Sequence, residues 1–91
     1  MTRHIALLRK TSTSGYSVDF PDFPGCVTAG FGLEEAPRLS AEALAFHIEG
    51  MAEDAAPVPP PSSLDAIMAD PLNRDAVAFL VPVSDKPGRE G

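Results

Sequence analysis

Residues 16–36, YSVDFPDFPGCVTAGFGLEEA, decide the fold of this 91-residue chain. Apolar and polar residues alternate over residues 16–20 and again over 26–31, which is the period of a half-buried strand. Between them, Pro21-Asp-Phe-Pro-Gly25 predicts a tight turn, because proline restricts φ and glycine accepts a positive φ. The stretch therefore predicts two strands joined by a turn, with a helix opening near Leu33.

Two further strands flank this stretch. Residues 4–10, HIALLRK, form a short apolar run, and the loop Thr11–Gly15 joins it to residue 16 as a β-hairpin. Residues 75–83, DAVAFLVPV, read as a last strand in which Pro82 fits only at a sheet edge or a strand end.

From Leu33 to about Ala55 the apolar residues recur with the spacing of one helix face. Pro37 is tolerated only in a first helical turn, so we expect the regular helix to begin nearer Glu34 or Glu35. One helix face carries Leu33, Ser40, Leu44, Ile48, Met51 and Ala55, with His47 at its margin. Between that face and an acidic one runs a second strip of Leu39, Ala43 and Phe46.

The segment after the helix is rich in proline. Pro57–Pro61 predicts an extended connector, and Ser62 or Ser63 is expected to cap a short helix over residues 64–69. The whole order is β-β-β-α-β with a short extra helix. We expect an α+β fold in which one long helix packs on a mixed four-stranded sheet through a right-handed crossover. The other sheet face would be left for association.

Charge and composition exclude several classes of function. Residues 17–70 hold ten acidic residues against Arg38 alone, a net charge of −9, and the whole chain carries −6. Such a body repels a phosphate backbone and suits a basic protein partner. One cysteine excludes an internal disulfide, and we find neither a leader peptide nor an apolar run of membrane-spanning length. We expect a cytoplasmic protein.

The motifs resemble the N-terminal domain of HicB-family antitoxins. The resemblance lies in FPDFPGC at residues 20–26, with Phe20, Pro21, Pro24, Gly25 and Cys26 as its structural motif, then LEEA at 33–36 and the Pro-rich connector with its Ser-Leu turn. It implies a partial RNase H-like fold and a role in neutralising a HicA-type toxin, a small basic ribonuclease that cleaves mRNA. Gly32 and Pro37 depart from the family pattern. The resemblance also implies a toxin-binding domain over residues 1–83. Residues 84–91 are polar and contain proline and glycine, so we expect a disordered tail that is too short for the C-terminal DNA-binding domain of many family members.

Several residues invite a catalytic reading. Asp19, Asp22, Glu34, Glu35 and Glu42 are candidate carboxylates for a two-metal nuclease. RNase H-like nucleases place a carboxylate in the centre of the first strand, and residues 4–8 contain none. We therefore interpret these acids as solvated and expect no catalytic activity, metal or cofactor. We likewise interpret Cys26 as a partly buried strand residue and His47 as a core-margin residue, because no orienting acid accompanies a Cys–His pair.

The second helix strip is the candidate partner site. Leu39 and Phe46, rimmed by Glu42 and Glu49, either contact the toxin or another subunit, or pack under the connector or short helix. We expect an antitoxin that inhibits without catalysis, forms a homodimer or larger homo-oligomer, and does not bind nucleic acid alone. The alternative is a self-associating HicB-like domain with no toxin partner.

Overall fold

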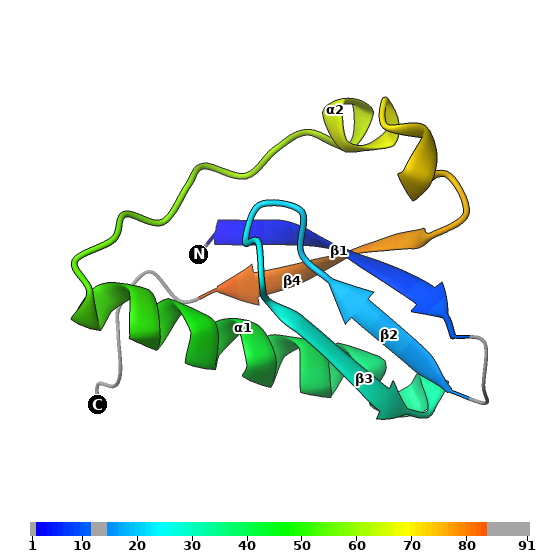
Figure 1. Cartoon of the computed structure of the whole chain (residues 1–91), viewed down its shortest axis with the longest axis horizontal. Coiled ribbons are helices and arrows are strands. Elements are labelled where there is room, and N and C mark those ends of the chain that lie inside the picture. The colour runs from blue at the N-terminus through cyan, green and yellow to red at the C-terminus, as the bar shows by residue number, and fades with distance from the viewer. Residues whose placement is uncertain (1, 12–14, 84–91) are drawn as a thin grey trace.

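The computed structural model describes residues 2–11 and 15–83. Its elements are β1 (Thr2–Lys10), β2 (Tyr16–Asp19), β3 (Val27–Phe31), the 3-10 turn η1 (Leu33–Glu35), α1 (Ala36–Glu53), α2 (Leu64–Met68), η2 (Pro71–Asn73) and β4 (Val77–Val83) (Figure 1). The order β-β-β-α-β with a short extra helix is as expected. The expected tail over 84–91 and part of the first loop lie outside the described residues.

The four strands form one sheet in the order β3-β2-β1-β4, and every neighbouring pair is antiparallel. The expectation of a mixed sheet with a right-handed parallel crossover was therefore wrong. Helix α1 carries the chain to the far end of the sheet, and the connector, α2 and η2 then bring it back before β4 begins (Figure 1). Consequently β4 runs against β1, with Thr2 opposite Val83.

The main core lies between the sheet and α1. Ala6, Val18, Phe20, Phe23, Cys26, Ala36, Leu44 and Val81 form it. Ser40 and Leu44 are fully buried, as the helix face predicted, and Ile48 and Met51 pack half-buried beside them. The prediction failed at the two ends of that face. Leu33 is 54% exposed in η1, and Ala55 follows the helix with φ +58°, so neither continues its period.

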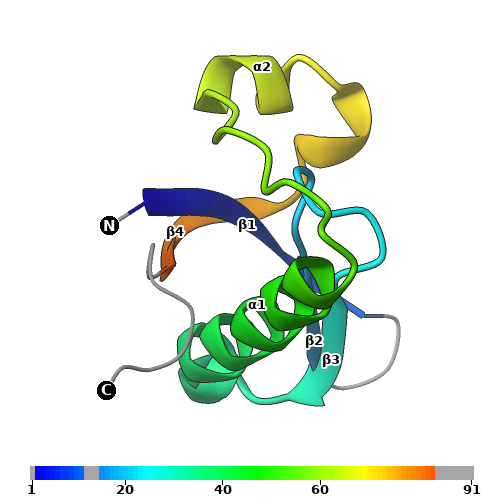
Figure 2. The same cartoon turned by 90° about the vertical axis from the view of Figure 1, so that its left-hand side faces the viewer.

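The opposite sheet face is not left free. Side chains of successive β1 residues alternate between the faces, so Ile5 and Leu7 point away from α1 and pack against Ile67 of α2. Figure 2 shows α1 and α2 on different sides of the sheet. Ser63 caps α2 by accepting a hydrogen bond from the Ala66 N–H at 3.1 Å. The expectation of a wholly uncovered face was wrong because the segment after the connector folds back over it.

Arg9 fastens η2 to the sheet. Its Nε donates to Asp19 Oδ1 at 2.7 Å, and its guanidinium also donates to the Leu72 carbonyl and to Asn73 Oδ1. The hydrogen bond with Asp19 raises the pKa of Arg9. Pro82 lies in β4, which is an edge strand as proline requires. None of the helices in the described ranges is long and apolar enough to cross a membrane.

Candidate functional site

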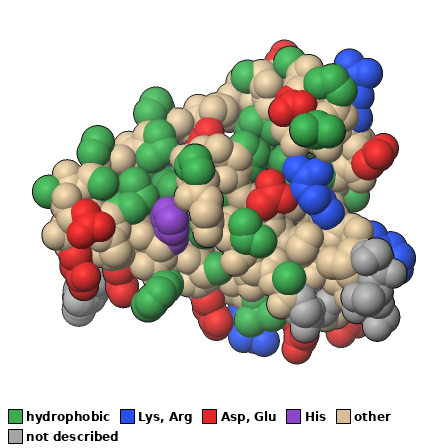
Figure 3. Space-filling view, in the orientation of Figure 1, with side chains coloured by type: hydrophobic (Ala, Val, Ile, Leu, Met, Phe, Trp, Pro, Cys, Tyr) green, Lys and Arg blue, Asp and Glu red, His purple; other side chains and the backbone are tan. Residues whose placement is uncertain are grey.

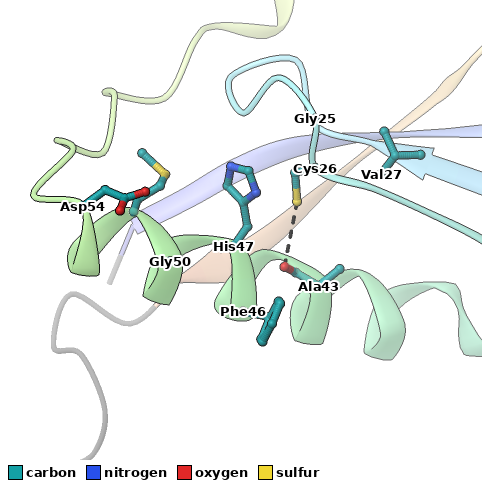
Figure 4. Close-up of a pocket in the computed structure, with 9 residues that line it drawn as sticks. Gly25, Cys26, Val27, Ala43, Phe46, His47, Gly50 and Asp54 are labelled. Atoms are coloured by element: carbon teal, nitrogen blue, oxygen red, sulfur yellow. Dashed lines mark hydrogen bonds between the residues drawn. The ribbon is translucent and has the colours of Figure 1, made fainter.

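A groove of about 470 Å³ runs between the β2–β3 turn and the outer side of α1. Its lining comes from two parts of the sequence: Gly25, Cys26 and Val27 on the turn side, and Ala43, Phe46, His47, Gly50, Met51 and Asp54 on the helix side (Figure 4). The lining is mostly apolar. The family-motif residues Gly25 and Cys26 thus line the same groove as the candidate partner residue Phe46.

Gly25 shapes the turn side of this groove. Its φ is +90°, a backbone conformation in which residues with a Cβ are strained. The turn is closed by hydrogen bonds from the Phe23 N–H to the Phe20 carbonyl and from the Cys26 N–H to the Phe23 carbonyl, both 2.9 Å. Pro21 and Pro24 restrict the same turn, so the motif forms a rigid wall.

Cys26 lies on the floor of the groove. It is 4% exposed, its Sγ lies 3.8 Å from the Ala43 carbonyl oxygen, and burial raises the pKa of its thiol (Figure 4). A buried thiol with a raised pKa is a poor nucleophile. Cys26 therefore acts here as a packing residue between the turn and α1.

The three residues of the predicted helix strip, Leu39, Ala43 and Phe46, have different environments in the structure. Leu39 is half-buried and packs against the main core, rather than under the connector or α2. Ala43 lines the groove, and Phe46 is 78% exposed beside it. Of the predicted apolar contacts, Phe46 is the one that offers most of its surface to a partner.

Several acidic side chains lie along α1, the helix that forms one side of the groove. Glu42 is exposed and accepts a hydrogen bond from Arg38 at 3.3 Å, whereas Glu49 is exposed without an ion-pair partner among residues 2–11 and 15–83. Glu53 and Asp54 follow at the end of α1, whose last turn holds no basic residue. Because a helix C-terminus favours positive charge, acids there are unfavourable for the isolated helix. Figure 3 shows acidic groups gathered along the lower left, over α1.

The candidate nuclease carboxylates are dispersed by the fold. Asp19 pairs with Arg9, Asp22 contacts His4, and Glu34, Glu35 and Glu42 are exposed on η1 and α1. Within the described ranges, no three His, Cys, Asp or Glu side chains lie close enough to hold a metal ion.

A buried polar cluster was missed by the sequence analysis. His4 is fully buried and its Nδ1 lies 3.2 Å from Asp22 Oδ2, while Ser62 donates to Asp22 from both its N–H at 2.9 Å and its Oγ at 2.5 Å. Burial alone would raise the pKa of Asp22, but the hydrogen bonds from Ser62 and His4 outweigh it and lower that pKa. The serine hydroxyl donates to the carboxylate rather than to the imidazole, so the three groups do not activate a nucleophile. A sequence signal existed: Asp22 lies inside the turn motif and Ser62 beside the α2 cap.

Comparison with known proteins identifies the family of this chain. Residues 4–88 match the family model described as HicB_like antitoxin of bacterial toxin-antitoxin system. The chain is 41% identical over 69 residues to an uncharacterized 14.9 kDa protein of the rep-hol intergenic region of Haemophilus phage HP1 (strain HP1c1). That match covers 76% of this chain and 52% of the phage protein, so the chain spans about half the length of this relative.

Solved structures with the same fold carry the same family name. The N-terminal domain of the Burkholderia pseudomallei antitoxin HicB superposes with a TM-score of 0.76 at 27% identity, covering 91% of this chain and 99% of that one. A longer structure of the B. pseudomallei antitoxin HicB gives 0.79 at 29% identity, covering 100% and 74%. A chain of the HicA3 and HicB3 toxin-antitoxin complex gives 0.74 at 28% identity, covering 91% and 99%.

Proposed function

Because the chain belongs to the HicB-like antitoxin family, we propose that it is an antitoxin that binds and inhibits a small, basic, HicA-type ribonuclease. The observation that carries the proposal is the groove beside α1, which has an apolar lining, an exposed Phe46 and acidic residues along the same helix. Inhibition here is occlusion of the toxin surface and involves no catalytic step by this chain.

The surface supplies two separable contributions to binding. Charge of opposite sign on the toxin speeds encounter, and this contribution weakens with salt. Phe46 and the apolar groove slow dissociation, because aromatic side chains buried at the centre of an interface carry much of the binding energy. In this proposal Glu49 and Asp54 raise the association rate, and Phe46 lowers the dissociation rate.

Co-expression with the product of the adjacent gene tests the proposal. We expect that protein to be small, basic and growth-inhibitory, to co-purify with this chain, and to lose its toxicity when the chain is present. An adjacent product that is not toxic, or that is toxic but neither binds the chain nor is neutralised by it, contradicts the antitoxin role.

Charge reversal tests the surface. Glu49→Lys removes an unpaired acid beside the groove, whereas Glu42→Lys also breaks the contact with Arg38. We expect both to slow toxin association at low salt by roughly threefold to tenfold, because rim charges act mainly on the association rate. Asp65→Lys makes the same charge change on α2 and serves as the control. If Glu49→Lys and Glu42→Lys associate with the toxin no more slowly than Asp65→Lys does, the toxin binds elsewhere.

Self-association is a second candidate function, supported by the β4 edge. Val77 is 60% exposed and Leu80 58% exposed on a strand with only one sheet neighbour. Such an edge can pair with another strand. We propose a homodimer or larger homo-oligomer formed along β4, and light scattering of Leu80→Glu tests it. A wild-type monomer at high concentration contradicts it.

Finer assignments follow from family membership. We propose that residues 1–83 form the toxin-binding domain, that the β-β-β-α-β order is a partial RNase H-like arrangement, and that the protein acts in the cytoplasm. We expect no specific binding of this 91-residue chain to its own promoter at physiological salt, because the −9 middle section repels phosphate. A mobility-shift assay decides this, and a nanomolar specific shift contradicts it.

A further inference from the structure

The connector between α1 and α2 is fastened at one residue. Four prolines lie within residues 57–61 and lack an N–H. After the Ala56 N–H, which bonds the Met51 carbonyl, and before the Ser63 cap, the hydrogen bonds of this described segment are those from Ser62 to Asp22. A polyproline segment forms no internal hydrogen bonds, so its position depends on such outside contacts.

Asp22 joins this attachment to the interior. Its Oδ2 accepts the Ser62 N–H and contacts His4 Nδ1, and its Oδ1 accepts the Ser62 hydroxyl. His4 is fully buried and its Nε2 has no hydrogen-bond partner in the described structure. One carboxylate therefore holds β1, the β2–β3 turn and the connector together.

From this cluster a row of rings leads to the groove. The Phe23 ring meets the His4 ring edge-on at a centroid distance of 4.7 Å and the His47 ring at 5.9 Å. His47 lines the groove (Figure 4). Phe23 belongs to the same hydrogen-bonded turn as Gly25 and Cys26. The groove wall is thus continuous with the residues that hold the connector, although Asp22, Ser62 and His4 do not line the groove.

We propose that Asp22, Ser62 and His4 are positioning residues for the toxin-binding groove: by tying the connector to the turn, they hold Phe23 and His47 in the arrangement that accepts the partner. The toxin-affinity part of this proposal rests on the proposed function. Deleting the Ser62 hydroxyl lowers the fraction of molecules with a formed groove, and apparent affinity falls by the same fraction. A hydrogen bond to a charged group is strong enough for a loss of roughly threefold to tenfold in affinity.

The test compares two adjacent serines. Ser62→Ala removes the hydroxyl that contacts Asp22, and Ser63→Ala removes the hydroxyl that caps α2, so each deletes one side-chain hydrogen bond. Ser62→Thr keeps a hydroxyl and provides the rescue. In the free chain we expect Ser62→Ala, but not Ser63→Ala, to shift the His47 imidazole NMR signals and to speed alkylation of Cys26 by a maleimide.

Binding to the adjacent gene product completes the test. We expect Ser62→Ala to weaken binding and Ser62→Thr to restore it, while Ser63→Ala binds as wild type despite its lost cap. Unchanged His47 signals and Cys26 reactivity in Ser62→Ala overturn the positioning role. Equal losses of affinity in both alanine variants also overturn it, because they indicate general destabilisation. If the wild-type chain does not bind the adjacent product, the proposed function fails, and the free-chain measurements still decide the positioning role.

Discussion

Phe46→Ala is expected to separate toxin binding from the stability of the free chain. Phe46 is 78% exposed in the free protein, so truncation removes little buried surface. We expect the free energy of unfolding to change by at most about 0.5 kcal/mol, as for other surface substitutions. Thermal or urea unfolding of the free chain measures this.

The expected loss in toxin binding is much larger. A phenylalanine side chain presents about 200 Å², and at 78% exposure about 150 Å² of it is available to a partner. At about 25 cal/mol per Å² the upper limit is about 4 kcal/mol. Since ordering costs offset part of this, we expect a loss of about 2 kcal/mol, or roughly thirtyfold in Kd. Calorimetry or surface binding with the adjacent gene product provides the measurement.

Leu72→Ala is the matched control. Leu72 is 80% exposed, like Phe46, but lies on η2 away from the groove. We expect this variant to keep both stability and affinity. Equal affinity of wild type, Phe46→Ala and Leu72→Ala refutes the assignment of the groove as the toxin site, and a loss of several kcal/mol of stability in Phe46→Ala refutes the reading of Phe46 as a free surface residue.

Three further results are expected. The pKa of Asp22 is lowered in the folded state, so its carboxylate stabilises the fold above the ordinary carboxyl pKa, and this stabilisation is lost as the pH falls through the folded-state pKa. The Tm of the wild type should therefore fall more steeply below about pH 4 than the Tm of Asp22→Asn. Parallel curves of Tm against pH for the two proteins contradict this. Gly25→Ala places a Cβ at φ +90° and should destabilise by about 1–2 kcal/mol, whereas Gly50→Ala in α1 should stabilise by up to about 1 kcal/mol in urea unfolding. Buried Cys26, with its raised pKa, should react with iodoacetamide far more slowly than free cysteine until denaturant is added, and a rate near that of free cysteine would show an open thiol.

Local patterns predicted the elements well because each depends on neighbours in the chain. Alternation identified β2 and β3, the Pro-Gly turn identified the positive φ at Gly25, and Pro82 predicted an edge strand. The prediction of the buried helix face was correct at Ser40 and Leu44, where α1 is regular. It was wrong in η1 and after Glu53, where the chain no longer follows the α-helical period.

The groove was only half visible in the sequence. Phe46 and Glu49 were singled out on the helix, and Gly25 and Cys26 in the turn motif, but no periodicity relates two segments separated by about twenty residues. Their meeting depends on how α1 packs across β2 and β3, which is a property of the assembled core.

Composition, alternation and turn chemistry thus determined the order of elements, the acidic character of the helix and the family resemblance, since each follows from local preferences and charge. Tertiary structure decided the all-antiparallel sheet, the coverage of its second face by α2, and the burial of His4 beside Asp22 and Ser62. The pairing of β1 with β4 brings Thr2 opposite Val83, and the hydrogen bonds of the polar cluster join residues 18 and 40 positions apart. Contacts at such separations form only when burial and hydrogen bonding offset the entropy of closing the chain between them.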